Sequence, residues 1–256
     1  MNIANNDKKT DVSIVIACYN EGPHLEQNVR EIITTMQQTV YRFELILVDD
    51  CSTDNTREII AAMCSDDTTG DLSAVYHERN TGRGKTVTDG IYHARGTVVG
   101  FLDIDLEVHA RYIPAMVGPI LADAYDVVTA KRVYKIIFSP ENMLRHILSA
   151  GYIRLVRFVL GIPYRDTETG YKFFNRKKIL PVLDKTENCS WFWDTEIMTL
   201  SYMHKLRVKE TECLFVRNEK KTSTLRVFRD SVDYFVELLK FKKRLLGSMR
   251  KNGEKI

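Results

Sequence analysis

The sequence predicts an α/β fold in which a doubly wound, mostly parallel sheet is followed by C-terminal amphipathic helices. Short apolar stretches alternate with stretches of helical spacing as far as residue 132. The apolar stretches are continuous, which is typical of strands that helices cover on both faces. Right-handed connections between such strands give a doubly wound sheet, and ligands bind that sheet at the carboxyl ends of its strands.

The elements follow from these two patterns in chain order. We expect strands at 12–20, 43–50, 72–78, 97–105 and 125–132. We expect helices between them at 22–38, 52–67, 84–96 and 111–123. The first helix has its apolar residues at helical spacing, the second opens with capping residues, and the third is expected to stop at Gly96. From residue 133 onward, amphipathic helices are expected at 139–163, 191–206 and 227–246, with a strand and a basic loop within 207–226.

The composition excludes several classes of protein. The chain has 256 residues, a formal net charge of +3 and five cysteines. An odd number of widely spaced cysteines without a C-x-x-C pair argues against a disulfide framework and against a zinc site. The N-terminus is too polar for a signal peptide, and no stretch approaches the roughly 18 apolar residues of a membrane span. No basic block outside the C-terminal region indicates a nucleic-acid partner, so we expect a cytoplasmic protein that can still lie on a membrane surface.

Acidic residues gather where the predicted strands end. Asp103, Asp105 and Glu107 follow the strand at 97–105, and strand residues two apart point to the same face. Carboxylates so close together need a cation, and oxygen ligands suit Mg²⁺ or Mn²⁺ bound together with a diphosphate. The alternative is a solvated acidic turn. Asp50 ends another buried strand, where its carboxylate could accept hydrogen bonds from a nucleobase or a ribose.

The glycine-rich stretch "RNTGRGKTV" contains Lys85 and leads into a predicted helix. It resembles the end of a P-loop, but the first glycine of that motif is replaced by Arg79, and the stretch follows the third strand. A nucleoside triphosphatase is therefore not expected. A glycine-rich loop before a helix can still bind a phosphate group.

Several motifs, in their order and spacing, resemble those of the family 2 glycosyltransferases with a GT-A fold. These motifs are "SIVIACYNEG", "ILVDDCSTDNT", "NTGRGKTVTDGIYHARG" and "FLDIDLE". In the second half, "DTETGYKFFNR" and "LRHILSAGY" resemble segments of the polyprenyl-phosphate sugar transferases, such as dolichol-phosphate mannose synthases and dolichol- or undecaprenyl-phosphate glucosyltransferases. The resemblance covers roughly residues 12 to 245.

The resemblance implies a role for particular residues on the donor side. The nucleotide-contacting segment corresponds to Ala17, Tyr19 and Glu21, with Ala17 in place of the usual proline. Asp50 matches the acid that reads the base. The metal-binding segment corresponds to Asp103, Asp105 and Glu107, where Glu107 replaces the usual glutamine.

The resemblance also implies an acceptor side. Arg132 matches an arginine after the fifth strand, and Arg145 and Ser149 match the pair that holds the acceptor phosphate. Lys221 lies in a loop that weakly resembles a further family motif. The segment "DTETGYK" supplies Asp166 and Lys172 as substrate-binding residues.

These roles imply that different segments of the chain bind the donor and the acceptor. We expect a disordered tail at 1–11, a nucleotide-sugar-binding half at 12–132, an acceptor-binding half with interfacial helices at 133–246, and a basic tail at 247–256. The helices of the second half either pack into the core or lie in the headgroup region of a membrane. The latter would place the protein at the cytosolic face, held by its helices or by a membrane-anchoring partner.

The expected reaction is an inverting, metal-dependent transfer from a sugar donor of the GDP-mannose or UDP-glucose type to a polyprenyl phosphate. A phosphate monoester is mostly dianionic near neutral pH, because its second pKa is about 6, so it needs no general base. Cationic side chains would offset its repulsion from the donor, namely Lys131, Arg132, Arg145 and Lys221. Two alternatives remain open: a hydroxyl acceptor with Asp194 or Glu196 as base, and a non-catalytic protein that binds nucleotide sugars. The two acids are equally typical of a helix N-terminus.

Overall fold

The computed structural model describes residues 9–134, 151, 153–216 and 227–252, and within α8 it describes the side chains of residues 233–247. The strands are β1 (Val12–Cys18), β2 (Phe43–Asp49), β3 (Leu72–Tyr76), β4 (Val98–Leu102), β5 (Val127–Tyr134), β6 (Tyr171–Asn175) and β7 (Val208–Phe215). The helices are α1 (Leu25–Gln37), α2 (Thr56–Asp66), α3 (Arg83–His93), α4 (Ile113–Leu121), α6 (Arg176–Leu183), α7 (Trp193–Met203) and α8 (Val227–Asn252). Residues 153–160 are also helical.

The strands form one seven-stranded sheet in the order β3-β2-β1-β4-β6-β5-β7. The first strands pair in parallel, because each is followed by a crossover helix. β6 runs antiparallel to both of its neighbours, β4 and β5, and β7 pairs in parallel with β5. The sheet thus joins strands from both halves of the chain, and the predicted division at residue 133 falls inside β5.

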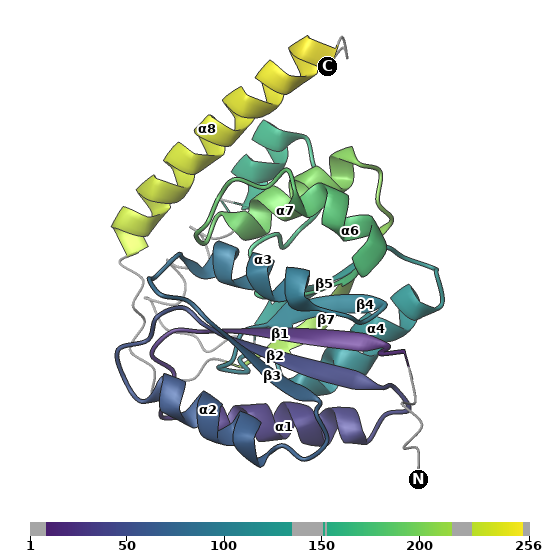
Figure 1. Ribbon diagram of the computed structural model, residues 1–256. Helices are drawn as coiled ribbons and strands as arrows, with labels where there is room; N and C mark the ends of the chain where they lie inside the picture. The colour runs from purple at the N-terminus through teal and green to yellow at the C-terminus, as the bar shows by residue number, and fades with distance from the viewer. Residues whose placement is uncertain (1–8, 135–150, 152, 217–226, 253–256) are drawn as a thin grey trace.

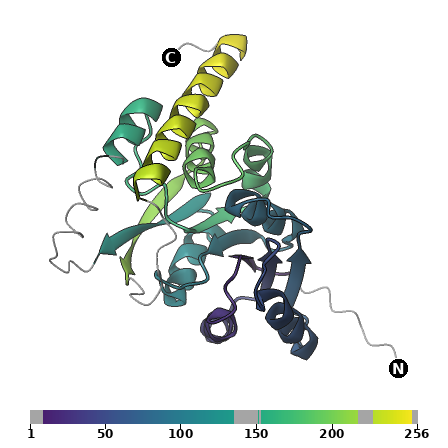
Figure 2. The same ribbon diagram turned by 90° about the vertical axis from the view of Figure 1, so that its left-hand side faces the viewer.

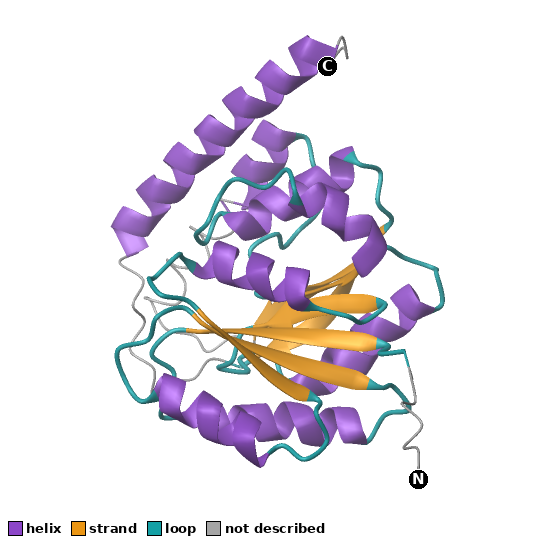
Figure 3. Cartoon of the chain, in the orientation of Figure 1, coloured by secondary structure: helices purple, strands orange, loops and turns teal. Residues whose placement is uncertain are grey.

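Helices cover both faces of the sheet and give two hydrophobic cores (Figures 1 and 3). Buried residues of α1, α2 and α4 pack on one face. Buried residues of α3, α6 and α7 pack on the other face, and α8 and the helix at 153–160 contribute to the same core. Both faces of the central strands are therefore buried under helices, which accounts for the continuous apolar stretches of the sequence.

The last helix, α8, lies along the outside of the layer that contains α7 (Figure 2). Leu238 and Phe241 are almost fully buried, and the ring centroids of Phe241 and Phe192 lie 5.7 Å apart. Three other apolar side chains of α8, Phe235, Val236 and Leu239, are each more than 40% accessible, and Val236 lines a cleft between α8 and residues 187–192. Among the described residues, no helix is long and apolar enough to cross a membrane.

The predicted elements are present, with corrections at their ends. The strand expected at 97–105 stops at Leu102, and the helix expected to run to Gly96 stops at His93. The predicted basic tail at 247–256 continues α8 as far as Asn252. The predicted tail at 1–11 is ordered at its end, because the Asp11 amide donates to the Arg42 carbonyl at 2.9 Å. Most of the helix expected at 139–163 lies outside the described residues.

Candidate functional site

Polar side chains follow β1, β2 and β4 at the edge of the sheet where these parallel strands end. Tyr19, just after β1, is 48% exposed, and Ala17 and Glu21 on either side of it are partly buried. Asp50 follows β2, and Asp103 follows β4 with a side chain that is 46% exposed. The structure therefore brings the predicted donor-binding residues to one edge, as the parallel topology requires.

Asp50 is a buried anchor for the loop before α3. Its carboxylate accepts hydrogen bonds from the amide and hydroxyl of Thr81 at 2.8 and 2.9 Å and from the amide of Gly82 at 2.9 Å, and His77 Nδ1 lies 2.8 Å away. Burial raises the pKa of Asp50, but the hydrogen bonds from His77, Thr81 and Gly82 outweigh it and hold the pKa below its usual value. Asp50 is therefore ionised, and a nucleobase that binds it has to replace one of these partners.

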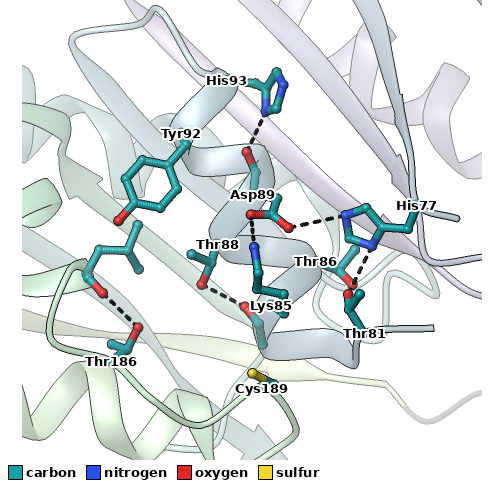
Figure 4. A network of polar contacts seen from close by, with 12 residues as sticks. His77, Thr81, Lys85, Thr86, Thr88, Asp89, Tyr92, His93, Thr186 and Cys189 are labelled. Carbon is teal, nitrogen blue, oxygen red and sulfur yellow. Dashed lines mark hydrogen bonds and ion pairs between the residues drawn. The ribbon is translucent and has the colours of Figure 1, made fainter. Parts of the chain in front are cut away.

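A second carboxylate extends this anchor along α3. His77 Nε2 lies 3.3 Å from Asp89, and Asp89 in turn contacts the ammonium of Lys85. Figure 4 shows the resulting chain of contacts from Lys85 through Asp89 and His77 to Thr81. Lys85, which the sequence suggested as a phosphate ligand, is thus engaged with Asp89 one helical turn away.

The acids of "DIDLE" lie in a turn, which corrects the expectation that they share one face of a strand. The Leu106 amide donates to the Asp103 carbonyl at 3.2 Å, and Leu106 has a φ of 52°. The Glu107 amide donates to the Asp105 carboxylate at 3.2 Å. In a turn, residues two apart in the sequence no longer point to the same side. The spacing of the acids therefore does not show that their carboxylates converge.

The donor chemistry of these acids suits a hard divalent cation, because all are carboxylates. As the residues are arranged, however, they do not fit such an ion. Among the described residues, no three His, Cys, Asp or Glu side chains lie close enough together to hold a metal. The Asp103 carboxylate is also already occupied by a cationic side chain.

That cation is Arg83, a site residue that the sequence did not reveal. Its Nη2 and Nε lie 2.7 and 3.1 Å from Asp103 Oδ1, and its Nη1 lies 2.6 Å from Asp194 Oδ2. The guanidinium packs between the rings of Phe101 and Trp191, with centroid distances of 5.4 and 5.1 Å. Arg83 is the first residue of α3, so the loop held by Asp50 determines where its side chain begins.

Asp194 is held by two cations, which leaves it poorly placed to act as a base. Besides Arg83, Lys172 donates to Asp194 Oδ1 at 2.6 Å, and Lys172 also contacts the Thr169 carbonyl. The Lys172 side chain is 0% exposed and that of Asp194 is 2% exposed. Lys172 therefore reaches the site only through Asp194 and Arg83.

Glu196, the other acid considered as a base, is also engaged. Its carboxylate accepts the amides of Glu187 and Asn188 at 3.0 and 2.8 Å and contacts the guanidinium of Arg244 on α8. Glu196 therefore fastens α8 and the loop before α7 to the rest of the fold.

Arg132 on β5 forms a two-pronged ion pair with Asp166. Its Nε and Nη2 lie 2.8 and 2.9 Å from the two carboxylate oxygens, and its amide donates to the same group at 3.0 Å. The pair joins two residues that were predicted separately, from different motifs. Lys131 beside it contacts Glu212 at 2.7 Å. Arg145, Ser149 and Lys221 lie outside the described residues.

Glu168 is a second site residue that the sequence did not reveal. It lies in the same loop as Asp166, and its carboxyl interacts electrostatically with Arg132, Asp166, Asp194 and Lys172. Burial, aided by the two aspartates and opposed by the two cations, raises the pKa of Glu168 to about 7. Its environment could be found only from the fold, because these neighbours are scattered along the sequence.

The raised pKa predicts how Glu168 affects stability. Between its usual value of 4.5 and about 7, the folded state holds a proton that the unfolded state has released, so stability falls as pH rises through this window. Replacing Glu168 with Gln removes this loss. We expect the free energy of unfolding of Glu168→Gln, relative to the wild type, to increase by up to about 3 kcal/mol between pH 5 and pH 8.

Urea unfolding at several pH values measures this difference. Glu78→Gln, at an exposed glutamate of the loop before α3, is the matched control and should show no such trend. A difference between Glu168→Gln and the wild type that does not change with pH would contradict the placement of Glu168 among these charges.

Comparison with known proteins identifies the family. The model of the glycosyl transferase family 2 matches residues 13–181. Glycosyltransferase AglD of Haloferax volcanii is 30% identical over 203 residues, which are 78% of this chain and 32% of that protein. A dolichyl-phosphate beta-glucosyltransferase of Saccharomyces cerevisiae is 26% identical over an alignment that covers 98% of this chain and 80% of that protein.

Other relatives match over shorter stretches. An undecaprenyl-phosphate 4-deoxy-4-formamido-L-arabinose transferase of Pseudomonas fluorescens is 37% identical over 121 residues, 47% of this chain and 35% of that protein. The chain thus spans about a third of the length of the Haloferax and Pseudomonas relatives.

Among solved structures, glucosyl-3-phosphoglycerate synthase from Mycobacterium tuberculosis, in complex with Mn²⁺, UDP and glucosyl-3-phosphoglycerate, has a TM-score of 0.67 at 18% identity, over 91% of this chain and 80% of that chain. The same enzyme in complex with Mg²⁺ and UDP has a TM-score of 0.66 at 19% identity, over 91% of this chain and 79% of that chain. The motifs, the sheet and the family match agree: this chain belongs to the glycosyl transferase family 2 and has the GT-A fold.

Proposed function

We propose that this protein transfers a sugar from a nucleoside diphosphate sugar to a polyprenyl phosphate at a membrane surface, with inversion at the sugar carbon. The observation that carries the proposal is the arrangement of the carboxyl edge of the sheet. Acids that suit a donor nucleotide follow β1, β2 and β4, and a cationic pair, Lys131 and Arg132, lies on β5. The relatives that match this chain include proteins that are named for polyprenyl-phosphate acceptors.

On the donor side, the nucleotide would lie over the ends of β1 and β2 and its diphosphate would lie near Asp103. Asp50 and the loop from His77 to Gly82 form an ionised surface there, and the base would bind Asp50 by replacing one of its present hydrogen-bond partners. Two negative phosphates beside several carboxylates require positive charge. We propose that a divalent cation, Mg²⁺ or Mn²⁺, would supply part of it when the donor binds, and the two solved complexes described above hold UDP together with such an ion.

On the acceptor side, the contacts of Asp194 and Glu196, the two acids predicted as bases, favour a phosphate over a hydroxyl. Asp194 and Glu196 are both buried and bound by cations, so neither is available to take a proton from a hydroxyl acceptor. A phosphate monoester needs no such base, because it is already ionised. Its oxygen would form the new bond to the sugar carbon as the bond from that carbon to the nucleoside diphosphate breaks, which inverts the carbon in one step.

Arg132 would hold the acceptor phosphate in place for this attack. Asp166 fixes its guanidinium from one side, which lowers the entropy cost of using it as a ligand. Arg132 is 19% exposed at its side chain, so it can present hydrogen-bond donors to an incoming anion.

The membrane part of the proposal rests on α8. Phe235 and Leu239 are exposed apolar residues one helical turn apart, and Lys243 follows one turn further along the same side. An apolar stripe with basic residues beside it is typical of helices that lie in the headgroup region of an anionic membrane. Such a helix would bring the site to the lipid acceptor, and we place it on the cytosolic face, with or without an anchoring partner.

The transfer reaction can be tested directly. We expect purified protein, given a short-chain polyprenyl phosphate, Mn²⁺ and a panel of UDP- and GDP-sugars, to form a glycosylated lipid phosphate from one donor, detected by mass spectrometry. The corresponding polyprenol, which lacks the phosphate, should give no product. Product from the polyprenol or from a sugar alcohol, with none from the phosphate, would establish the hydroxyl-acceptor alternative instead.

The same assay tests the role of Arg132. Arg132→Gln should lower kcat/KM for the acceptor by about a hundredfold, since a charge-assisted contact contributes roughly 2–3 kcal/mol, and should change the donor KM little. Arg165→Gln, at a neighbouring exposed arginine, is the matched control. Equal losses for donor and acceptor, or no loss, would remove Arg132 from the acceptor site.

Membrane binding gives a further prediction. We expect the protein to float with vesicles of phosphatidylcholine and phosphatidylglycerol, and we expect the double variant Phe235→Asn, Leu239→Asn to bind about tenfold more weakly because it loses apolar burial. Val40→Asn, at a valine that is 93% exposed elsewhere on the fold, should bind like the wild type. Unchanged binding of the double variant would show that α8 is not the membrane contact.

A further inference from the structure

One aromatic side chain is open to solvent at the phosphate end of the proposed donor site. Trp191 is 49% exposed, and its ring centroid lies 5.1 Å from the guanidinium carbon of Arg83. Arg83 in turn contacts Asp103 just after β4. An exposed apolar residue on its own is common on protein surfaces. The position of Trp191 is informative, because a single guanidinium separates its ring from the carboxylate near which we place the donor diphosphate.

The loop before α7 directs this ring toward the donor site and not toward α8. Phe192, the next residue, packs against Phe241 of α8 with 5.7 Å between the ring centroids, and Ser190 lines the cleft beside α8. Trp191, which lies between them in the chain, contacts Arg83 on α3. Neighbouring side chains of the loop thus serve two different surfaces, and the indole belongs to the surface at the carboxyl edge of the sheet.

Close packing against α3 fixes the backbone that carries Trp191. The Lys85 amide donates a hydrogen bond to the Cys189 carbonyl at 3.2 Å. The same carbonyl lies so close to Gly82 that a Cβ atom there would come within 2.5 Å of its oxygen. The loop is therefore seated on the first turn of α3, and the indole is in place before a ligand arrives.

Arg83 supports one side of the indole and is itself held at both ends. Two of its N–H groups reach Asp103 Oδ1, at 2.7 and 3.1 Å, and a third reaches Asp194 Oδ2 at 2.6 Å. The Arg83 side chain is 11% exposed, so water reaches little of it. A guanidinium against an aromatic ring is a favourable contact. The indole thus rests on a fixed support, while nearly half of Trp191 stays accessible.

A fixed, accessible aromatic ring beside a diphosphate suits a sugar. A pyranose carries hydroxyl groups around its edge and C–H groups on its face, and stacking that face on an aromatic ring buries apolar surface of both. In a nucleotide sugar, the pyranose is joined directly to the diphosphate and so lies next to it. We infer that Trp191 is the platform on which the transferred sugar stacks. The inference rests on the proposed nucleotide-sugar donor, and not on the acceptor.

Calorimetric titration with UDP, UDP-glucose, GDP and GDP-mannose tests the platform without any transfer reaction. For the nucleotide sugar that the wild type binds, we expect Trp191→Ala to have an affinity about tenfold lower, because the stacked surface is lost. Its affinity for the matching nucleoside diphosphate should equal that of the wild type. Trp191→Phe keeps an aromatic face and should recover most of the loss. Phe158→Ala, at an aromatic residue that is 87% exposed elsewhere on the fold, is the matched control and should bind like the wild type.

Two results of this titration would overturn the inference. Equal losses for the nucleotide sugar and for its nucleoside diphosphate would show that Trp191 acts only by covering Arg83. An unchanged affinity of Trp191→Ala for the nucleotide sugar would show that the ring does not contact the sugar.

Fluorescence of the unaltered protein gives a second measurement. The chain has two tryptophans, and Trp193 is fully buried, so quenching by acrylamide reports mainly on Trp191. We expect the nucleotide sugar that binds to reduce this quenching more than its nucleoside diphosphate does, because the sugar covers the ring. Equal protection by the two ligands would contradict stacking.

The outcomes separate this inference from the proposed reaction. Binding of neither nucleotide sugar would refute the proposed donor and the platform together. A failure of lipid transfer alone would leave the titration and quenching results in force, and loss of the platform alone would leave the transfer reaction standing.

Discussion

The site depends on one arginine that is shared by two aspartates. Arg83 connects Asp194, which is buried beneath the site, to Asp103, which opens to solvent at the end of β4. Lys172 holds Asp194 from the other side, so two cations and two carboxylates balance one another in a row. Without Arg83, the outer acid would lose its partner and the inner acid would keep only one. The remainder of the carboxyl edge is arranged around this row.

The backbone that carries Arg83 is fixed by Asp50. Its carboxylate holds Thr81 and Gly82 immediately before α3, and His77 and Asp89 extend the same network along the helix. Asp50, the residue predicted to read the base, thus also fixes the backbone from which Arg83 begins. A change at Asp50 is expected to affect both the base and the diphosphate, because one loop links them.

Much of this edge could be predicted from the sequence, because strand ends are local features. Continuous apolar stretches that run into Asp50 and Asp103 place these acids at the carboxyl ends of parallel strands, and the structure agrees. The directions in which these acidic side chains point could not be predicted, because a turn with Leu106 at positive φ replaces the strand that the spacing suggested. Arg83 was not found, since its partners lie 20 and 111 residues further along the chain.

Asp194 and Glu196, the two acids that the sequence suggested as bases, also have partners that could not be predicted from the sequence. A helix N-terminus and an active site both favour acidic residues, and only the fold reveals that Asp194 meets Lys172 and that Glu196 meets Arg244. Glu168 shows the opposite case, a residue that looked ordinary in its motif and acquires its raised pKa from charges brought together by the fold.

A crystal structure with UDP or GDP and Mn²⁺ would test the central claim most directly. The account predicts a nucleotide over the ends of β1 and β2, with its base beside Asp50 and its diphosphate near Asp103. A nucleotide bound elsewhere, for example in the cleft between residues 187–192 and α8, would contradict it.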